Sequence, residues 1–329
     1  MGVGFSCKNT LYFCKNSAQV FFLQKYGFCG LFAQAGATFA VETLTAKRMK
    51  PYEMQWSSAT PGLLVILLDQ SGSMLENYDG NDSKTVFAAK AVNRVIDTII
   101  QKNFDGESPK NRCFITVIGY DNYVREICSG YLKDLEANPV RIVEVMKKQS
   151  DGAGGLVEIP YKMPVWVEPI TQDGATNMKG AFEMAKAIVR KWLEDKPGHP
   201  APVVINISDG APYYDNKTVE GCMDETSLSA KELMNLRSDD GQVLLFNALI
   251  KKAGQNIVFP AHLNEGCAPE ARFLFDISSE VPESFFAAAS KNGLPLEQGS
   301  RGCIFEADGV QLVSLIDFGS SKGMGDIRR

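Results

Sequence analysis

The sequence predicts an α/β fold with a largely parallel sheet covered by helices on both faces. A continuous apolar run at 63–68 is typical of a strand that is buried on both sides of a sheet. Apolar residues at helical spacing follow it over 84–102. Strand and helix patterns then alternate toward the C-terminus, and such alternation favours parallel strands joined by crossover helices.

The remaining elements are predicted from the same two periodicities. Two strands, 113–118 and 123–128, are joined by a tight turn at Asp121-Asn122 and indicate an antiparallel hairpin. The later elements, in chain order, are a helix at 132–149, a small hairpin or ordered loop at 157–170, a helix at 176–194, a strand at 202–208, helices at 227–237 and 241–253, a strand at 255–263, a helix at 282–292, a strand at 302–306 and a helix at 310–318.

Composition excludes several classes of function. A chain of 329 residues is long enough for one large α/β domain with insertions or for two small domains. The net charge of -5 offers no general attraction to phosphate backbones, so nucleic-acid binding is disfavoured. No apolar run reaches the length of a bilayer-spanning helix, so we expect no membrane span.

The cysteine pattern indicates reduced thiols and a cytoplasmic protein. The chain has eight cysteines, none in a CxxC pair, and the odd number after the first segment leaves at least one thiol unpaired there. With only two histidines, a zinc site is not expected.

Residues 1–48 differ from the rest of the chain and are expected to be a leader of uncertain order. Glu42 is their only carboxylate, and Phe, Gly and Cys are frequent. One interpretation is a signal peptide cleaved near 37–40, which would make the protein exported, although the polar residues 24–26 interrupt its apolar stretch. The other interpretation places the native start at Met49.

The candidate functional residues begin directly after the first buried strand, with Asp69-Gln70-Ser71-Gly72-Ser73. Ligand sites of parallel α/β sheets lie at the carboxyl ends of strands. A carboxylate and two hydroxyls are oxygen donors for a hard divalent cation, and Gly72 lets the loop bend tightly. Alone, the same pentad also fits a helix cap.

Two later segments add oxygen ligands at the same predicted edge. The segment 173–177 leads into a helix, and 207–210 ends a buried strand. Together with the pentad, they resemble the metal-ion-dependent adhesion site of the von Willebrand factor A (VWA) family over about residues 60–320. The matching residues are Asp69, Ser71, Ser73, Thr176 and Asp209.

The resemblance implies a Rossmann-like VWA fold, a doubly wound and mostly parallel six-stranded sheet with one antiparallel edge strand. The hairpin at 113–128 would supply that edge strand. The VWA domain would span 49–329. The stretch before Thr176 is longer than is usual in the family, which indicates an insertion near 150–170. This insertion would either lie at the metal rim and shape partner choice, or be a surface hairpin without such a role.

The resemblance also implies how the site works. Ser71 and Ser73 would bind Mg²⁺ or Mn²⁺ directly, Thr176 directly or through water, and Asp69 and Asp209 largely through water. Because Mg²⁺ prefers octahedral geometry and the carboxylates stay mostly outside its first shell, the ion would keep an open position. A carboxylate from a partner protein would fill it.

These residues predict a metal-dependent protein-binding module rather than an enzyme. We see no nucleotide-binding loop, no nucleophile elbow and no general base beside the site; His199 and His262 fit surface or structural roles better. The chain resembles stand-alone bacterial proteins of the tellurite-resistance type, which implies kinase-like or phosphatase-like partners. The alternatives are a secreted or surface adhesion protein and, third, a metal-dependent hydrolase.

Overall fold

The computed structural model describes most of the chain after Met49. The described residues are 50–80, 82–150, 155–170, 173–250, 256–291, 294–306, 311–312 and 314–315. The leader predicted at 1–48 and the alternative start at Met49 lie outside them. Of the helix predicted over 310–318, the four residues described are helical.

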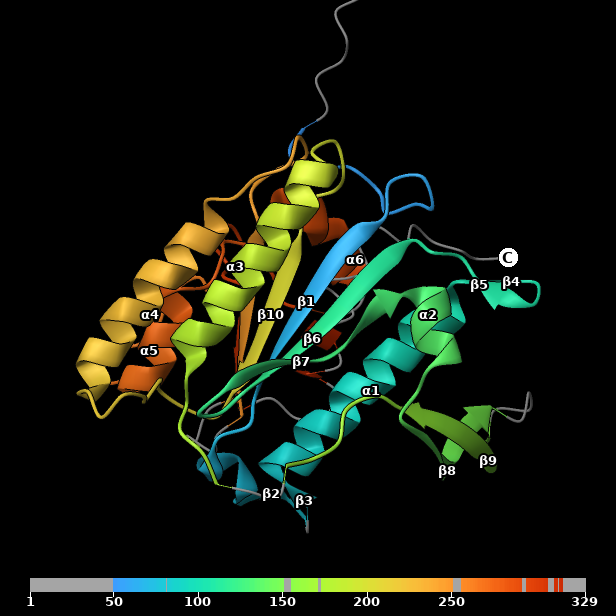
Figure 1. The fold of residues 1–329 in the computed structure, drawn as a ribbon, viewed down its shortest axis with the longest axis horizontal. Helices are drawn as coiled ribbons and strands as arrows, with labels where there is room; N and C mark the ends of the chain where they lie inside the picture. Colours follow the sequence, from blue (N-terminus) through green and yellow to red (C-terminus); the bar gives the residue numbers. More distant parts are fainter. Residues whose placement is uncertain are drawn as a thin grey trace, which may run out of the picture. The chain divides into compact units, whose positions relative to one another are not determined.

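Within the described residues, one large sheet has the strand order β12-β13-β11-β10-β1-β6-β7 (Figure 1). Five neighbouring strands, from β13 to β6, are parallel, and β7 runs antiparallel to β6 at one edge. The strands are β1 (Gly62–Asp69), β6 (Cys113–Tyr120), β7 (Val124–Tyr131), β10 (Val203–Ser208), β11 (Leu244–Leu249), β12 (Ile257–Val258) and β13 (Cys303–Phe305). The predicted fold class is confirmed, including the antiparallel edge from the 113–128 hairpin. The two-residue β12 adds a seventh strand, antiparallel to β13.

Helices cover both faces of this sheet (Figure 1). The first face carries α1 (Lys84–Lys102), α2 (Leu132–Ala137), the 3-10 helix η2 (Glu283–Phe285) and α6 (Phe286–Lys291); the second carries α3 (Met178–Asp195), α4 (Val219–Met234) and α5 (Pro269–Asp276). Alternate residues of β1 enter the two cores: Leu64 and Ile66 pack toward α1, and Leu63 and Val65 toward α3. The apolar run at 63–68 therefore reflects a strand buried on both faces.

Several short elements lie between β1 and β6 in the chain, on either side of α1. They are the 3-10 helix η1 (Gly72–Leu75), the hairpin β2 (Asn77–Asp79) and β3 (Asp82–Ser83), and the hairpin β4 (Phe104–Asp105) and β5 (Ser108–Pro109). The strand β3 leads directly into α1.

The helix predicted over 132–149 is wrong. Only α2 forms, and it ends at Ala137 before Pro139, because a residue that precedes proline is disfavoured in helical conformation. An antiparallel hairpin follows, β8 (Arg141–Ser150) with β9 (Leu156–Val165). Ile142 and Met146 lie four residues apart, a spacing that shares one face in both a helix and a strand, so the pattern did not separate the two.

The segment predicted as an insertion near 150–170 contains β9, the second strand of a hairpin that begins at Arg141. Its ladder lies beside α1 (Figure 1), where the Tyr161 hydroxyl is 2.8 Å from each carboxylate oxygen of Asp97. Asp97 is about 20 Å along α1 from Lys84 at 1.5 Å per residue. This contact places the ladder along the flank of α1, away from the predicted metal rim.

The helix predicted over 241–253 is also wrong, because 244–249 form the parallel strand β11. Every residue of β11 is buried, and a short apolar run of this kind does not separate a buried strand from a buried helix by periodicity. The strand predicted over 255–263 is reduced to the two residues of β12.

Two further features bear on the sequence predictions. The five cysteines from Cys113 onward are free thiols in the structure. Among the residues that the structure describes, no helix combines the length and apolar character needed to cross a bilayer.

Candidate metal site

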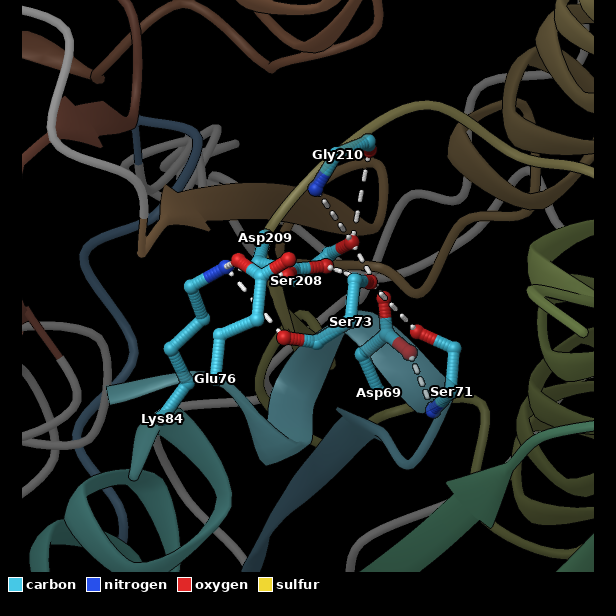
Figure 2. A network of polar contacts seen from close by, with 8 residues as sticks. All are labelled: Asp69, Ser71, Ser73, Glu76, Lys84, Ser208, Asp209 and Gly210. Atoms are coloured by element: carbon cyan, nitrogen blue, oxygen red, sulfur yellow. Dashed lines mark hydrogen bonds and ion pairs between the residues drawn. The ribbon is translucent and has the colours of Figure 1, made fainter. Parts of the chain in front are cut away.

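The site begins where β1 ends, at Asp69. Its carboxylate is fully buried. Oδ1 accepts a hydrogen bond from the backbone N–H of Ser71 at 2.8 Å, and Oδ2 accepts one from the Ser208 hydroxyl at 2.6 Å (Figure 2). Because β1 and β10 are parallel neighbours, their carboxyl ends bring these residues to one edge of the sheet. The Asp69 carboxylate is thus held from both strands.

The two serine hydroxyls of the pentad lie beside this carboxylate. Ser71 Oγ is 3.2 Å from Ser73 Oγ, and the Ser73 hydroxyl donates to Oδ1 of Asp209 at 2.8 Å (Figure 2). Asp209 directly follows β10 and is buried. Four of the five predicted residues therefore belong to one network of polar contacts.

Thr176, the fifth predicted residue, reaches the same edge through its backbone. Its N–H donates to the Tyr213 carbonyl at 2.8 Å, and the Tyr213 N–H donates to the Thr176 carbonyl at 3.1 Å. The N–H of Gly72 donates to the Gly174 carbonyl at 2.9 Å. The threonine loop is thus fastened to the pentad on one side and to the segment after β10 on the other.

Gly72 lies close to the side chain of Asp173. A side chain at this position would overlap Oδ1 of Asp173, which lies over the pentad loop. Any larger residue at this position would require the Asp173 carboxylate to shift. Asp173 brings a third carboxylate to this edge, and it is not among the site residues predicted from the sequence.

The buried carboxylate of Asp69 lies in an unfavourable electrostatic environment. Burial, and then the nearby charge of Asp209, raise the pKa of Asp69 to about 7, against hydrogen bonds from Ser208 and Ser71 that lower it. Desolvation and a like charge both disfavour the ionised form. An additional positive charge at this edge would stabilise the ionised form of Asp69.

One such charge is already present in Lys84, the first residue of α1. Its ammonium donates to Oδ2 of Asp209 at 2.8 Å, to Oε2 of Glu76 at 2.7 Å and to the Ser73 carbonyl at 3.3 Å (Figure 2). Burial lowers the pKa of Lys84, but hydrogen bonds to Asp209 and Glu76 outweigh it and raise that pKa above its ordinary value.

Sequence reasoning missed Lys84, although a signal was present. A cation in the first turn of a helix opposes the helix dipole. A lysine at the start of a predicted helix, a few residues after the D-x-S-x-S pentad, therefore indicates nearby carboxylates.

A chain of buried, hydrogen-bonded polar side chains lies within the sheet near the site, and the sequence analysis did not predict it. The Tyr120 hydroxyl donates to Asn206 at 2.8 Å, Asn206 to Asn247 at 3.0 Å, and Asn247 to the Ser278 hydroxyl at 2.9 Å. Burial and then the charge of Asp69 raise the pKa of Tyr120 well above its ordinary value, so the phenol stays neutral. Buried and hydrogen-bonded, these polar side chains link β6, β10 and β11 to the end of α5.

The donor set fits a hard divalent cation. Among the described residues, no group of three or more His, Cys, Asp or Glu side chains forms a metal-binding cluster. The candidate site instead combines the carboxylates of Asp69 and Asp209 with the hydroxyls of Ser71 and Ser73, and the backbone of Thr176 lies at the same edge. Oxygen donors of this kind suit Mg²⁺ or Mn²⁺ better than a metal that prefers sulfur or nitrogen.

The comparisons with known proteins give only distant similarities. No family model and no curated protein matches the chain. Among solved structures, BatB from Bacteroides thetaiotaomicron, a conserved hypothetical protein, is 12% identical with a TM-score of 0.41, over 80% of this chain and 100% of that chain. The manganese-loaded TRAP protein of Plasmodium vivax is 13% identical with a TM-score of 0.37, over 82% of this chain and 74% of that chain.

A third structure is proximal thread matrix protein 1 from the mussel byssus, with a zinc-occupied MIDAS motif. It is 11% identical with a TM-score of 0.37, over 82% of this chain and 48% of that chain. Scores this low do not establish a family, so the fold assignment rests on the strand order described above.

Proposed function

We propose that this chain is a VWA-type domain that binds Mg²⁺ or Mn²⁺ and, through the ion, an acidic side chain of a partner protein. The proposed metal-binding residues are Asp69, Ser71, Ser73, Thr176 and Asp209. The observation that carries the proposal is the single polar network formed by the first three of these residues and Asp209 at the carboxyl edge of the sheet.

The contacts of Asp69 support a division of roles within this set. Both of its carboxylate oxygens already accept hydrogen bonds, from Ser71 and Ser208. Asp69 would therefore supply charge and orient the loop, while the hydroxyls of Ser71 and Ser73 offer lone pairs toward a cation. When bound, the ion supplies an electrophilic point that accepts a carboxylate. This agrees with the roles that the resemblance implies.

Binding rather than catalysis is the better proposal for this edge of the sheet. A hydrolase needs a general base within hydrogen-bond reach of its substrate. Nδ1 of His199 is 3.1 Å from the carbonyl of Pro61, at the amino end of β1 and thus a strand length from Asp69. Turnover of generic phosphate or ester substrates with Mg²⁺ would contradict this part of the proposal.

For the partner we propose a protein with an exposed Asp or Glu. The finer hypothesis is a cytoplasmic adaptor with a kinase-like or phosphatase-like partner, supported by the resemblance to tellurite-resistance proteins and by free cysteines such as Cys113 and Cys222. Affinity capture from native lysate, with Mg²⁺ and with EDTA in parallel, tests whether partner binding depends on the ion.

The metal assignment is tested by thermal denaturation with Mg²⁺, Mn²⁺ or EDTA. An ion present at a hundred times its Kd and bound only by the folded state stabilises it by about 2.7 kcal/mol. Asp69→Asn and Ser71→Ala should remove this increase. Ser129→Ala, which removes a hydroxyl bonded to Glu126 on β7, should retain it. A wild-type protein with no cation-dependent shift and no bound metal at millimolar Mg²⁺ would disprove the assignment.

A further inference from the structure

The ammonium of Lys84 is buried at the start of a helix, where both the loss of water and the helix dipole disfavour a positive charge. Its side chain is 8% exposed, and that of Asp209 is 3% exposed. Taking a charge out of water is costly unless it is paired, and the start of α1 repels cations through the helix dipole. The contacts that offset these costs come from Asp209, Glu76 and the Ser73 carbonyl.

Two of these three contacts involve the proposed metal site. Asp209 Oδ1 accepts the Ser73 hydroxyl, while Oδ2 accepts the Lys84 ammonium. The third contact, Glu76, lies outside the proposed ligands, and its side chain is 69% exposed. Lys84 is therefore held between one carboxylate of the site and one carboxylate at the surface (Figure 2).

We infer that Lys84 is an internal cation that competes with the metal for Asp209 and so lowers the affinity of the site for divalent ions. The inference rests on the proposed function. An ammonium paired with Asp209 offsets one of the two negative charges that Asp69 and Asp209 offer. A site weakened in this way leaves more of the ion's charge to be balanced by an acidic partner.

Glu76 opposes the effect of Lys84 on metal affinity. Because it shares the Lys84 ammonium with Asp209, it draws part of the hydrogen bonding of Lys84 away from the site. Among the residues that the structure describes, removing the Glu76 charge leaves Asp209 as the one carboxylate bonded to Lys84. The two residues should therefore affect metal affinity in opposite directions.

The experiment is a calorimetric titration of the full chain with Mn²⁺ alone. Lys84→Gln should bind Mn²⁺ about tenfold or more tightly than wild type, because a neighbouring unit charge changes an ion's binding equilibrium by at least this much in a partly buried site. Lys84→Arg keeps the charge and should stay close to wild type. Lys90→Gln is the matched control: Lys90 lies on the same helix in an exposed pair with Asp82, so its loss should change affinity by less than about twofold.

A second variant keeps the test decisive if Lys84→Gln does not fold. Glu76→Gln alters an exposed side chain and should weaken Mn²⁺ binding several-fold. In the double variant Lys84→Gln/Glu76→Gln, the effect of Glu76→Gln should shrink, because Lys84 transmits most of it. A merely structural Lys84 would give no tightening in Lys84→Gln and no such coupling.

The outcomes separate this inference from the proposed function. A wild-type protein that binds no Mn²⁺ overturns both. If wild type binds Mn²⁺ but folded Lys84→Gln binds it no more tightly, the inference fails while the metal site stands. If Lys84→Gln does not fold, unchanged Mn²⁺ affinity in Glu76→Gln overturns the inference.

Discussion

Two regions of the domain depart in opposite ways from the usual rule that apolar side chains are buried and polar ones are exposed. At the carboxyl edge of the sheet, polar and charged side chains are buried, with Asp69 at 0% and Asp209 at 5% exposure. On the outer face of the β8–β9 hairpin, apolar side chains are exposed, with Ile142 at 59% and Met146 at 60%. A buried polar group must be paired, whereas an exposed apolar side chain needs no partner. The first region therefore carries the stronger sign of function.

Two prolines of the hairpin disfavour the pairing of another strand with β9. Pro160 and Pro164 of β9 lie opposite Met146 and Ile142 of β8. Because proline has no N–H, these pairs cannot be hydrogen-bonded pairs, and the proline nitrogens face away from β8. At these two positions, the edge of β9 that faces away from β8 therefore has no N–H donor for another strand. The two regions therefore differ in kind: the carboxyl edge of the sheet holds buried, paired polar groups, whereas the hairpin exposes apolar side chains beside prolines that disfavour the addition of a further strand.

The largest expected effect comes from breaking the buried ion pair. In metal-free buffer, Asp209→Asn leaves the Lys84 ammonium buried with less compensation, and the free energy of unfolding should fall by about 3–5 kcal/mol. Asp82→Asn breaks the exposed pair with Lys90 and should cost less than about 1 kcal/mol. Urea denaturation measures both. Equal losses would show that burial at the carboxyl edge does not set the strength of the pair.

The next effect concerns pH. Because Asp69 has a pKa near 7 in the folded protein, above its ordinary value of 3.8, the folded state keeps a proton that the unfolded state has lost between these values. Stability of the metal-free protein should therefore fall as pH rises from 4 toward 7, by at most about 1.4 kcal/mol per pH unit.

Unfolding free energies measured across this window, for wild type and Asp69→Asn, test this expectation. The asparagine does not titrate, so the difference between the two curves isolates the contribution of Asp69. If the difference between the two curves did not change with pH, the ionised form of Asp69 would not be disfavoured in the metal-free folded protein.

The convergence of the candidate site residues was easier to predict than the hairpin, for a physical reason. Asp69 ends the buried strand β1 and Asp209 directly follows the buried strand β10, and parallel neighbours bring their carboxyl ends to one edge of the sheet. The residue types then restrict the chemistry to oxygen ligands. For Lys84, the local pattern indicates only that carboxylates lie nearby; that one of them is Asp209 depends on the folded position of α1 relative to the end of β10.

The hairpin and β11 were mistaken because local periodicity is ambiguous there. Ile142 and Met146 share a face in either kind of element. In β11, all residues are apolar except Asn247, and this asparagine is a member of the buried polar chain beneath the site. Its hydrogen bonds to Asn206 and Ser278 exist only after distant segments have come together.

A smaller effect is expected where the hairpin meets α1. Tyr161→Phe removes the hydroxyl bonded to Asp97 and should lower the free energy of unfolding by about 1–2 kcal/mol. Mn²⁺ affinity measured by calorimetry should stay unchanged, because this contact lies about 20 Å along α1 from Lys84. A change in metal affinity would couple the hairpin to the site and weaken the contrast between the two regions.

The smallest effect is expected on the outer face of the hairpin. Ile142→Ser combined with Met146→Ser should change the free energy of unfolding by less than about 0.5 kcal/mol, because both side chains are already exposed to water. Val165→Ala is the matched control, since Val165 is on β9 but is buried, and its truncation should cost about 2 kcal/mol. Urea denaturation of the two variants compares the faces directly. A loss of about 2 kcal/mol in the double serine variant would mean that Ile142 and Met146 are covered in the folded protein in solution. The hairpin's outer face would then be an occupied surface, and its exposure would no longer distinguish it from the buried edge of the sheet.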